Sequence, residues 1–344
     1  MNALCWLGAI VVMMAGTSAL AAETVLRVLS WPGYADADVV AAFERRSGAK
    51  VRITLIGSDD HLRERMRARD GGDFDVVAAS TAEIERFIAR GLVLPIDPAN
   101  IPNIARQLPR FRDLRDMDSL VRDGRRYAVP YTYSEMGLIY DRRAFPQPPA
   151  RLADLWDERY RGRVLAYDGS THNFSLAAIK TGGDPFLIPS ERFAAMAAEL
   201  VALRRNVLTF YTLPEESVQL FLRHEVVLMF ANYGTQQLKM LQDAGADVGY
   251  VIPQEGTLAW LDCWAISRGV RDRALAEAWI DHMTAPEVGR TLSEREGLAN
   301  TVDAALAPDD DERIFWLKPV EDDDLRARLW RRIAAGDRLE VMLQ

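Results

Sequence analysis

The sequence is organised around the stretch Val251-Ile-Pro-Gln-Glu-Gly-Thr-Leu-Ala-Trp260-Leu-Asp262-Cys-Trp-Ala-Ile266. Two apolar segments flank its loop at Pro253–Gly256, and this pattern predicts a strand, a loop and a second strand. Side chains two residues apart in a strand share a face, so we expect Trp260 and Asp262 to point to the same side. An indole face beside a carboxylate attracts an organic ammonium group. The alternative is that Trp260 belongs to the core, while Asp262 caps a turn or pairs with an arginine.

The overall composition is that of a globular protein. The 344 residues are 49% hydrophobic and 27% charged, which is enough chain for about two domains. The net charge is −8 and no basic stretch stands out, so we expect no nucleic-acid partner.

The chain beyond residue 22 carries no recognisable motif of a catalytic or metal site. Its four histidines lack metal-ligand spacing, and there is no Gly-x-Ser-x-Gly motif, phosphate loop or dinucleotide fingerprint. Cys263 has apolar neighbours, which favours a buried thiol over a nucleophile. We therefore expect no enzyme, no cofactor and no metal, and instead a ligand-binding protein with its site in a cleft.

Residues 1–22 have the pattern of an export signal. They are uncharged, contain an apolar run and end in Ser18-Ala-Leu-Ala21-Ala22, which predicts a secretory signal peptide with an Ala19-x-Ala21 cleavage motif. No Lys or Arg precedes the apolar run, so an uncleaved membrane anchor is the alternative. Because Cys5 would leave with the signal, Cys263 would remain alone and no internal disulfide would form.

The mature sequence alternates between strand and helix patterns. Strands are expected near residues 25–30, 50–56 and 73–79, each followed by a helix, and residues 152–243 repeat this α/β pattern. A βαβαβ order implies parallel strands, with ligands bound beyond their carboxyl ends. Trp31 and Tyr34 follow the first strand, and Ser80 and Thr81 follow the third, although a turn or cap role is the alternative for each.

Several short motifs occur in the order and spacing of a known family. They are Leu29-Ser-Trp31-Pro-Gly-Tyr34, Phe74-Asp-Val-Val77-x-x-Ser80, Val129-Pro-Tyr131, Ile252-Pro-x-Glu-Gly256, Trp260-x-Asp262 and Arg328-x-Trp330. With them, the chain resembles the periplasmic spermidine- and putrescine-binding proteins of ABC importers.

This resemblance implies an α/β fold of the type II periplasmic binding proteins, with two lobes, each a mostly parallel sheet flanked by helices, that close on a ligand. We assign residues 1–22 to the signal peptide, 23–132 and 262–305 to lobe 1, and 133–261 and 306–344 to lobe 2. The resemblance further implies a monomer in the periplasm. It would bind a small amine-containing ligand and deliver it to ABC permease subunits in the inner membrane, or signal through a membrane receptor as the alternative.

The resemblance also implies which residues bind the ligand. Trp31 and Tyr34 would line the cleft from lobe 1, Trp260 would form an aromatic wall and Asp262 would hold an ammonium group. The full set of candidate ligand-binding residues is Trp31, Tyr34, Ser80, Thr81, Tyr133, Asp168, His172, Asn232, Tyr233, Trp260 and Asp262.

The sequence departs from the family pattern at one end of this site. His172 stands where the family has a glutamate that grips an amine, and Ala82, Asn232 and Leu298 stand where it has aromatic residues. We therefore expect Asp262 to anchor one amine.

The other end of the site would differ from that of the family. His172, Asn173, Asn232 and Tyr233 would meet a neutral or anionic group, as in a monoamine or an amino acid. Glu135 is a candidate replacement for the missing carboxylate, and an exposed salt bridge is its alternative role.

Overall fold

The structure is a computed structural model that describes residues 23–113, 117–303 and 313–342. The predicted signal peptide and its alternative as a membrane anchor, residues 1–22, lie outside these described residues. Within them, no helix has the length and apolarity to cross a bilayer.

The predicted βαβαβ unit is confirmed. Its parallel strands lie side by side in the order β3-β1-β2, and two of its three helices, α2 and α3, begin at side-chain caps. The Ser58 hydroxyl accepts a hydrogen bond from the backbone of α2, and the Ser80 hydroxyl accepts one from the backbone of α3. These two helices therefore start directly at the carboxyl ends of β2 and β3. The helices of this unit are α1 (Ala37–Ser47), α2 (Asp59–Arg67) and α3 (Thr81–Ala89).

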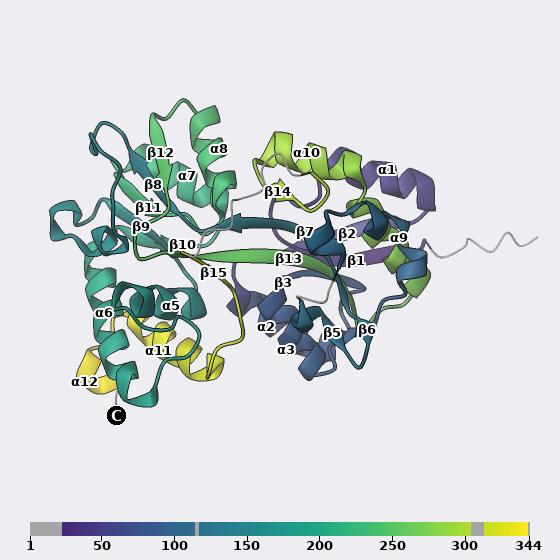
Figure 1. Cartoon of the computed structure of the whole chain (residues 1–344), viewed down its shortest axis with the longest axis horizontal. Helices are drawn as coiled ribbons and strands as arrows, with labels where there is room; N and C mark the ends of the chain where they lie inside the picture. Colours follow the sequence, from purple (N-terminus) through teal and green to yellow (C-terminus); the bar gives the residue numbers. More distant parts are fainter. Residues whose placement is uncertain (1–22, 114–116, 304–312, 343–344) are drawn as a thin grey trace, which may run out of the picture.

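In the described part of the chain, the first sheet has eight strands and forms the body on the right of Figure 1, which we call lobe 1. Its strands, in spatial order, are β14 (Ala299–Asn300), β7 (Ala128–Glu135), β13 (Thr257–Ser267), β3 (Val76–Ser80), β1 (Val25–Ser30) and β2 (Lys50–Leu55), with β15 (Ile314–Trp316) and β4 (Val93–Leu94) also paired to β13. This lobe further contains α4 (Pro109–Arg112), the ribbon β5 (Val121–Arg122) and β6 (Arg125–Arg126), α9 (Arg273–Met283) and α10 (Pro286–Glu296).

The second sheet forms the body on the left of Figure 1, which we call lobe 2. Its strands, in spatial order, are β10 (Thr209–Tyr211), β9 (Val164–Tyr167), β11 (Leu228–Phe230), β8 (Leu138–Asp141) and β12 (Val248–Val251). Its helices are α5 (Ser170–Lys180), α6 (Phe193–Asn206), α7 (Pro214–Arg223), α8 (Thr235–Asp243), α11 (Asp323–Ala335) and α12 (Leu339–Met342).

Both sheets are mixed, whereas the sequence analysis expected mostly parallel ones. The strands joined by crossover helices are parallel, but β13 pairs antiparallel with β3 and β7, and β8 pairs antiparallel with β11 and β12. The reason lies in the connections. β13 returns from lobe 2 after a short loop, so it enters the first sheet from the opposite end.

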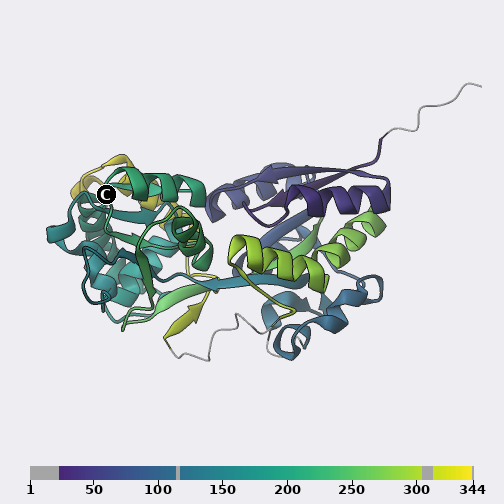
Figure 2. The same cartoon turned by 90° about the horizontal axis from the view of Figure 1, so that it is seen from above.

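The long strands β7 and β13 join the two lobes, as Figures 1 and 2 show. All eleven residues of β13 are buried, because the strand is covered on both faces and paired on both edges. This arrangement confirms the predicted strand, loop and strand around Val251–Ile266. It also leaves Cys263 fully buried at the centre of the sheet. Two of the predicted lobe boundaries, after residues 132 and 261, fall inside β7 and β13, which cross between the lobes. The third, after residue 305, lies outside the described residues.

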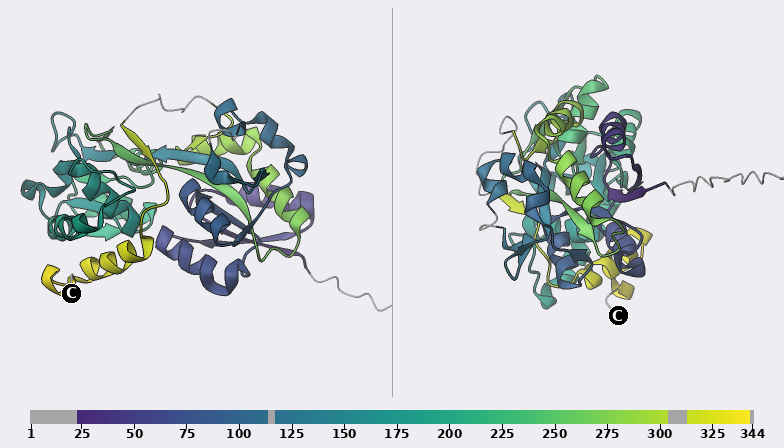
Figure 3. Two further views of the ribbon diagram at one scale, coloured as in Figure 1. Left: turned by 60° about the horizontal axis from the view of Figure 1, so that its bottom comes forward. Right: turned by 90° about the vertical axis from the view of Figure 1, so that its right-hand side faces the viewer.

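The helix α11 packs against α5 and α6 of lobe 2 and lies beside α2 and α3 of lobe 1 (Figure 3, left). Its Arg326 is completely buried and pairs with Glu321 at 2.7 Å. The same guanidinium donates to the Ser175 hydroxyl at 3.0 Å and to two backbone carbonyls of lobe 2. A charge buried this deeply is held by its partners, so Arg326 ties α11 to lobe 2.

Candidate functional site

The turn after β1 brings two aromatic side chains to the boundary between the lobes. Gly33 has a φ of +80° and lies against Gln236 of lobe 2, where a Cβ atom would come within 2.3 Å of the amide nitrogen. A glycine is therefore required for both the backbone conformation and the close approach. The turn places Trp31 and Tyr34 in the buried interior, 7% and 4% exposed.

The strand β13 contributes Trp260 and Asp262, which line the same pocket as their spacing predicts. The Tyr34 hydroxyl donates a hydrogen bond of 2.8 Å to the Asp262 carboxylate, and the Tyr34 and Trp260 rings lie 6.4 Å apart. Asp262 is opposite Ser80 in the pairing of β13 with β3, so Ser80 lies at the same end of the sheet. The predicted anchor is thus a buried carboxylate beside two aromatic rings.

Lobe 2 closes the pocket from the other side with Tyr167, His172, Asn232 and Tyr233. The Trp260 indole donates to the backbone carbonyl of Asn232 at 2.9 Å, which links β13 to the segment after β11. The Tyr167 hydroxyl likewise donates to a lobe 1 carbonyl, that of Gly57, at 2.9 Å. The pocket therefore belongs to both lobes at once.

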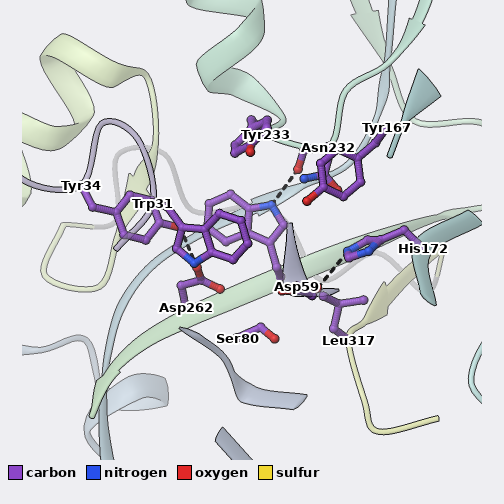
Figure 4. A pocket seen from close by; sticks show the side chains of 11 residues that line it. Trp31, Tyr34, Asp59, Ser80, Tyr167, His172, Asn232, Tyr233, Asp262 and Leu317 are labelled. Carbon is purple, nitrogen blue, oxygen red and sulfur yellow. Dashed lines mark hydrogen bonds and ion pairs between the residues drawn. The ribbon is translucent and has the colours of Figure 1, made fainter. Parts of the chain in front are cut away.

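Eleven residues line the pocket, and Figure 4 shows their side chains converging between the lobes. They are Trp31, Tyr34, Asp59, Ser80, Tyr167, His172, Asn232, Tyr233, Trp260, Asp262 and Leu317. The free volume inside is about 30 Å³, which is room for about one water molecule. Any larger molecule enters only when the lobes or these side chains move.

Three predicted residues lie outside this lining. The Thr81 hydroxyl faces a backbone carbonyl 3.5 Å away, and the Tyr133 hydroxyl accepts a hydrogen bond from Arg110 at 2.9 Å. The Asp168 carboxylate accepts a hydrogen bond of 2.7 Å from the indole of Trp330. Each of these side chains has a protein partner and none of them lines the pocket, so we do not propose them as ligand contacts.

The two residues weighed for the far end of the site, Asn173 and Glu135, also lie outside the lining. The Asn173 amide donates to the backbone carbonyls of Tyr167 and Gly169 at 2.7 and 2.9 Å. Glu135 is the last residue of β7 and is partly exposed. Glu135 therefore does not supply a second carboxylate to the pocket.

The sequence analysis missed three lining residues, Asp59, Tyr167 and Leu317. Asp59 is the most important, because it brings to the pocket a carboxylate that was not among the predicted site residues. A signal existed: Asp59 follows the second parallel strand after three residues, at the same edge of the sheet as Trp31 and Ser80.

Burial changes the acidity of the ionisable groups in the pocket. It raises the pKa of the Asp262 carboxyl to about 8, although the hydrogen bond from Tyr34 acts in the opposite direction. Burial also raises the pKa of Asp59 to about 6, against the lowering effect of the nearby Arg63 charge. It lowers the pKa of His172 to about 4, with Arg63 adding to the effect, so the His172 ring is neutral at pH 7.

These residues together suit an organic cation. Two carboxylates and two indoles attract positive charge, and the neighbouring phenol rings add apolar walls. The Trp31 Nε1, His172 Nδ1 and Asn232 Oδ1 atoms are buried and have no hydrogen-bond partner among the described residues. A search of those residues also finds no cluster of three or more side chains that would hold a metal ion.

Comparison with known proteins gives a consistent family. The family model described as "Bacterial extracellular solute-binding protein" matches residues 38–315. The chain is 24% identical to the putrescine-binding periplasmic protein PotF of Escherichia coli strain K12, over 96% of each chain.

Among solved structures, a putative spermidine/putrescine ABC transporter protein from Listeria monocytogenes superposes with a TM-score of 0.80 at 21% identity, over 90% of this chain and 99% of that one. The binding protein MotA from A. tumefaciens B6, solved in complex with glucopine, superposes with a TM-score of 0.68 at 15% identity, over 91% and 99% of the two chains. Identities this low establish a shared two-lobed fold, and that part of the prediction is confirmed.

Proposed function

The chain belongs to the bacterial extracellular solute-binding proteins, and from this we propose that it binds a small amine-containing solute in the periplasm and delivers it to an ABC permease. One observation carries the proposal. The buried Asp262 carboxylate lies in a pocket walled by the indoles of Trp31 and Trp260. A carboxylate taken out of water needs a positive partner, and an ammonium group inside these aromatic walls supplies it.

The known relatives support the amine as the ligand class. The similar E. coli protein is named for putrescine, a diamine, and the Listeria structure for spermidine and putrescine. The A. tumefaciens protein has the same fold and was solved with glucopine, so the fold alone does not select a polyamine. The choice between such ligands rests on the side chains of the pocket.

Closure of the lobes is the proposed mode of binding. Contacts such as those of Tyr167 with Gly57 and of Ser170 with Asp60 form between groups of different lobes. The free volume of about 30 Å³ is too small to admit an alkyl amine directly. We propose that residues 23–132 with 262–305, and 133–261 with 306–344, separate as two bodies to admit the ligand, with β7 and β13 flexing between them.

Calorimetric titration of the purified protein tests the proposed function. We expect micromolar or tighter binding of at least one compound among 1,4-diaminobutane, spermidine, 1-aminobutane and 4-aminobutanoate. Asp262→Ala should abolish it, whereas Asp324→Ala, an acid-to-alanine change at a position that is 59% exposed in its side chain, should not. Absence of binding for every amine in the wild-type protein would refute the proposal.

A further inference from the structure

Asp59 is the one acidic residue of the pocket that neither the motifs nor the relatives' names point to. It is the first residue of α2, lines the pocket and is 9% exposed. In Figure 4 it lies toward His172, on the side of Trp31 away from Tyr34. The Asp59 Oδ2 atom is 3.7 Å from the His172 Nε2 atom, and no hydrogen bond to the Asp59 carboxylate is found among the described residues.

The structural tasks near Asp59 are performed by its neighbours. The cap of α2 is the hydroxyl of Ser58. Asp60 forms the ion pair with Arg63 at 2.6 Å and accepts two hydrogen bonds from Ser170 of lobe 2. Asp59 is therefore not needed to begin the helix or to hold the lobes together.

The charges around Asp59 leave it uncompensated. Arg63 and Arg86 are the nearby cations, but both are already paired, Arg63 with Asp60 and Glu83 and Arg86 with Glu83 and Asp323. His172 is neutral at pH 7 because burial lowers its pKa to about 4. A buried carboxylate with so little compensation destabilises the closed form unless a cation arrives with the ligand.

We propose that Asp59 holds a second cationic group of the ligand, opposite the one held by Asp262, and so makes the pocket select diamines over monoamines and amino acids. This inference rests on the proposed function and sharpens it. It also reverses the expectation for the His172 end of the site. An anionic group placed there would face the Asp59 carboxylate, and like charges in a buried site repel strongly.

Asp59→Asn tests the inference because it removes the charge and keeps the shape. The probes are 1,4-diaminobutane, 1-aminobutane and 4-aminobutanoate, which have the same four-carbon chain and differ in the group at its far end. In the wild-type protein we expect the diamine to bind most tightly. A charged hydrogen bond contributes about 1.5–3 kcal/mol, so Asp59→Asn should weaken diamine binding roughly tenfold to a hundredfold. Its effect on 1-aminobutane should stay within about threefold.

Glu64→Gln is the matched control, since it makes the same charge change on the exposed face of the same helix. Glu64→Gln should change neither the affinity for 1,4-diaminobutane nor that for 1-aminobutane. Circular dichroism checks that both variants fold. Equal weakening of diamine and monoamine by Asp59→Asn, or no weakening, would overturn the inference and leave the proposed function standing. So would a wild-type protein that prefers 1-aminobutane or 4-aminobutanoate. A wild-type protein that binds no amine at all would overturn both.

Discussion

Arg86 of α3 in lobe 1 forms an ion pair with Asp323 of α11 in lobe 2, outside the pocket. Both side chains are largely shielded, 10% and 14% exposed, and the neighbouring Arg67 lies 3.7 Å from the same carboxylate. The pair forms only when the two lobes meet. Partial burial strengthens it relative to a surface salt bridge, so it contributes to the equilibrium between open and closed forms.

Asp323→Asn should therefore weaken ligand binding without touching the ligand. Loss of one partner of a shielded pair costs about 1–2 kcal/mol of closure, so we expect roughly a fivefold to thirtyfold loss of 1,4-diaminobutane affinity. Small-angle scattering should report a larger radius of gyration. The control is Asp243→Asn, whose side chain is 63% exposed and pairs with Lys239 of the same helix. Unchanged affinity and radius in Asp323→Asn would contradict a role of this ion pair in closure.

Ligand binding should release a proton from Asp262. Its pKa of about 8 in the ligand-free protein means that the carboxyl is mostly protonated at pH 7, whereas an ammonium ligand binds the ionised form. We expect the affinity for 1,4-diaminobutane to rise from pH 6 to about pH 8 and then level off. Calorimetry at pH 7 in buffers of different ionisation enthalpy measures the released proton directly. Affinity that falls over this range would disprove the assignment of Asp262 as the anchor.

The same residue should make the ligand-free protein less stable at high pH. The pKa of Asp262 is about 8 in the folded state and near 3.9 in the unfolded state. Between these values the folded protein holds the extra proton, so the free energy of unfolding falls as the pH rises from about 4 to about 8.

Asp262→Asn removes this effect and keeps an acceptor for the Tyr34 hydroxyl. We expect the variant to exceed the wild type in stability by roughly 5 kcal/mol at pH 9. At pH 4 the two should differ little. Urea unfolding at both pH values measures the difference, with Asp324→Asn as the charge control.

Trp260 should contribute to binding by two routes. Its ring lines the pocket, and its indole nitrogen donates a hydrogen bond to the Asn232 carbonyl, which holds the ring in place. Trp260→Leu should lower the affinity for 1-aminobutane and 1,4-diaminobutane alike, by roughly tenfold or more, because both carry an ammonium group over the ring. Trp316→Leu is the control, since Trp316 is 36% exposed and outside the lining. Equal losses in the two variants would argue against a ligand contact by Trp260.

Arg326 should matter for stability and not for ligand recognition. Arg326→Met leaves the shielded Glu321 carboxylate without its ion-pair partner, which typically costs about 3–5 kcal/mol. Chemical unfolding should show this loss, while the exposed Arg328→Met should change the free energy of unfolding by less than about 0.5 kcal/mol. Similar stabilities of the two variants would refute the view that Arg326 ties α11 to lobe 2.

The sequence predicted the lobe 1 side of the site well. Trp260 and Asp262 follow from the two-residue period of a strand, and Trp31 and Ser80 follow from their places at the carboxyl ends of parallel strands. At such strand ends, however, the sequence does not show which of two similar adjacent residues points into the pocket. Ser80 lines the pocket and Thr81 does not, because one position along the chain changes the direction of the side chain.

The role of Asp59 could not be predicted from the sequence for a similar reason. Ser58, Asp59 and Asp60 together have the composition of a helix start, and each is a plausible cap. Which acid faces the pocket depends on how α2 packs against α5. There the Ser170 hydroxyl donates a hydrogen bond to Asp60, and the Asp59 carboxylate lies near His172. Contacts between lobes are tertiary and leave no periodic trace in a single sequence.

The burial of Cys263 has a practical consequence. Its thiol is inaccessible in the middle of β13, and Cys5, the other cysteine of the sequence, belongs to the predicted signal segment. Maleimide dyes should therefore attach only to cysteines introduced on the surface. A donor and an acceptor placed on α1 and α6 would report the distance between the lobes by energy transfer in otherwise native protein. The native thiol can stay in place, so the strand that carries Trp260 and Asp262 need not be altered to turn the molecule into an optical amine sensor.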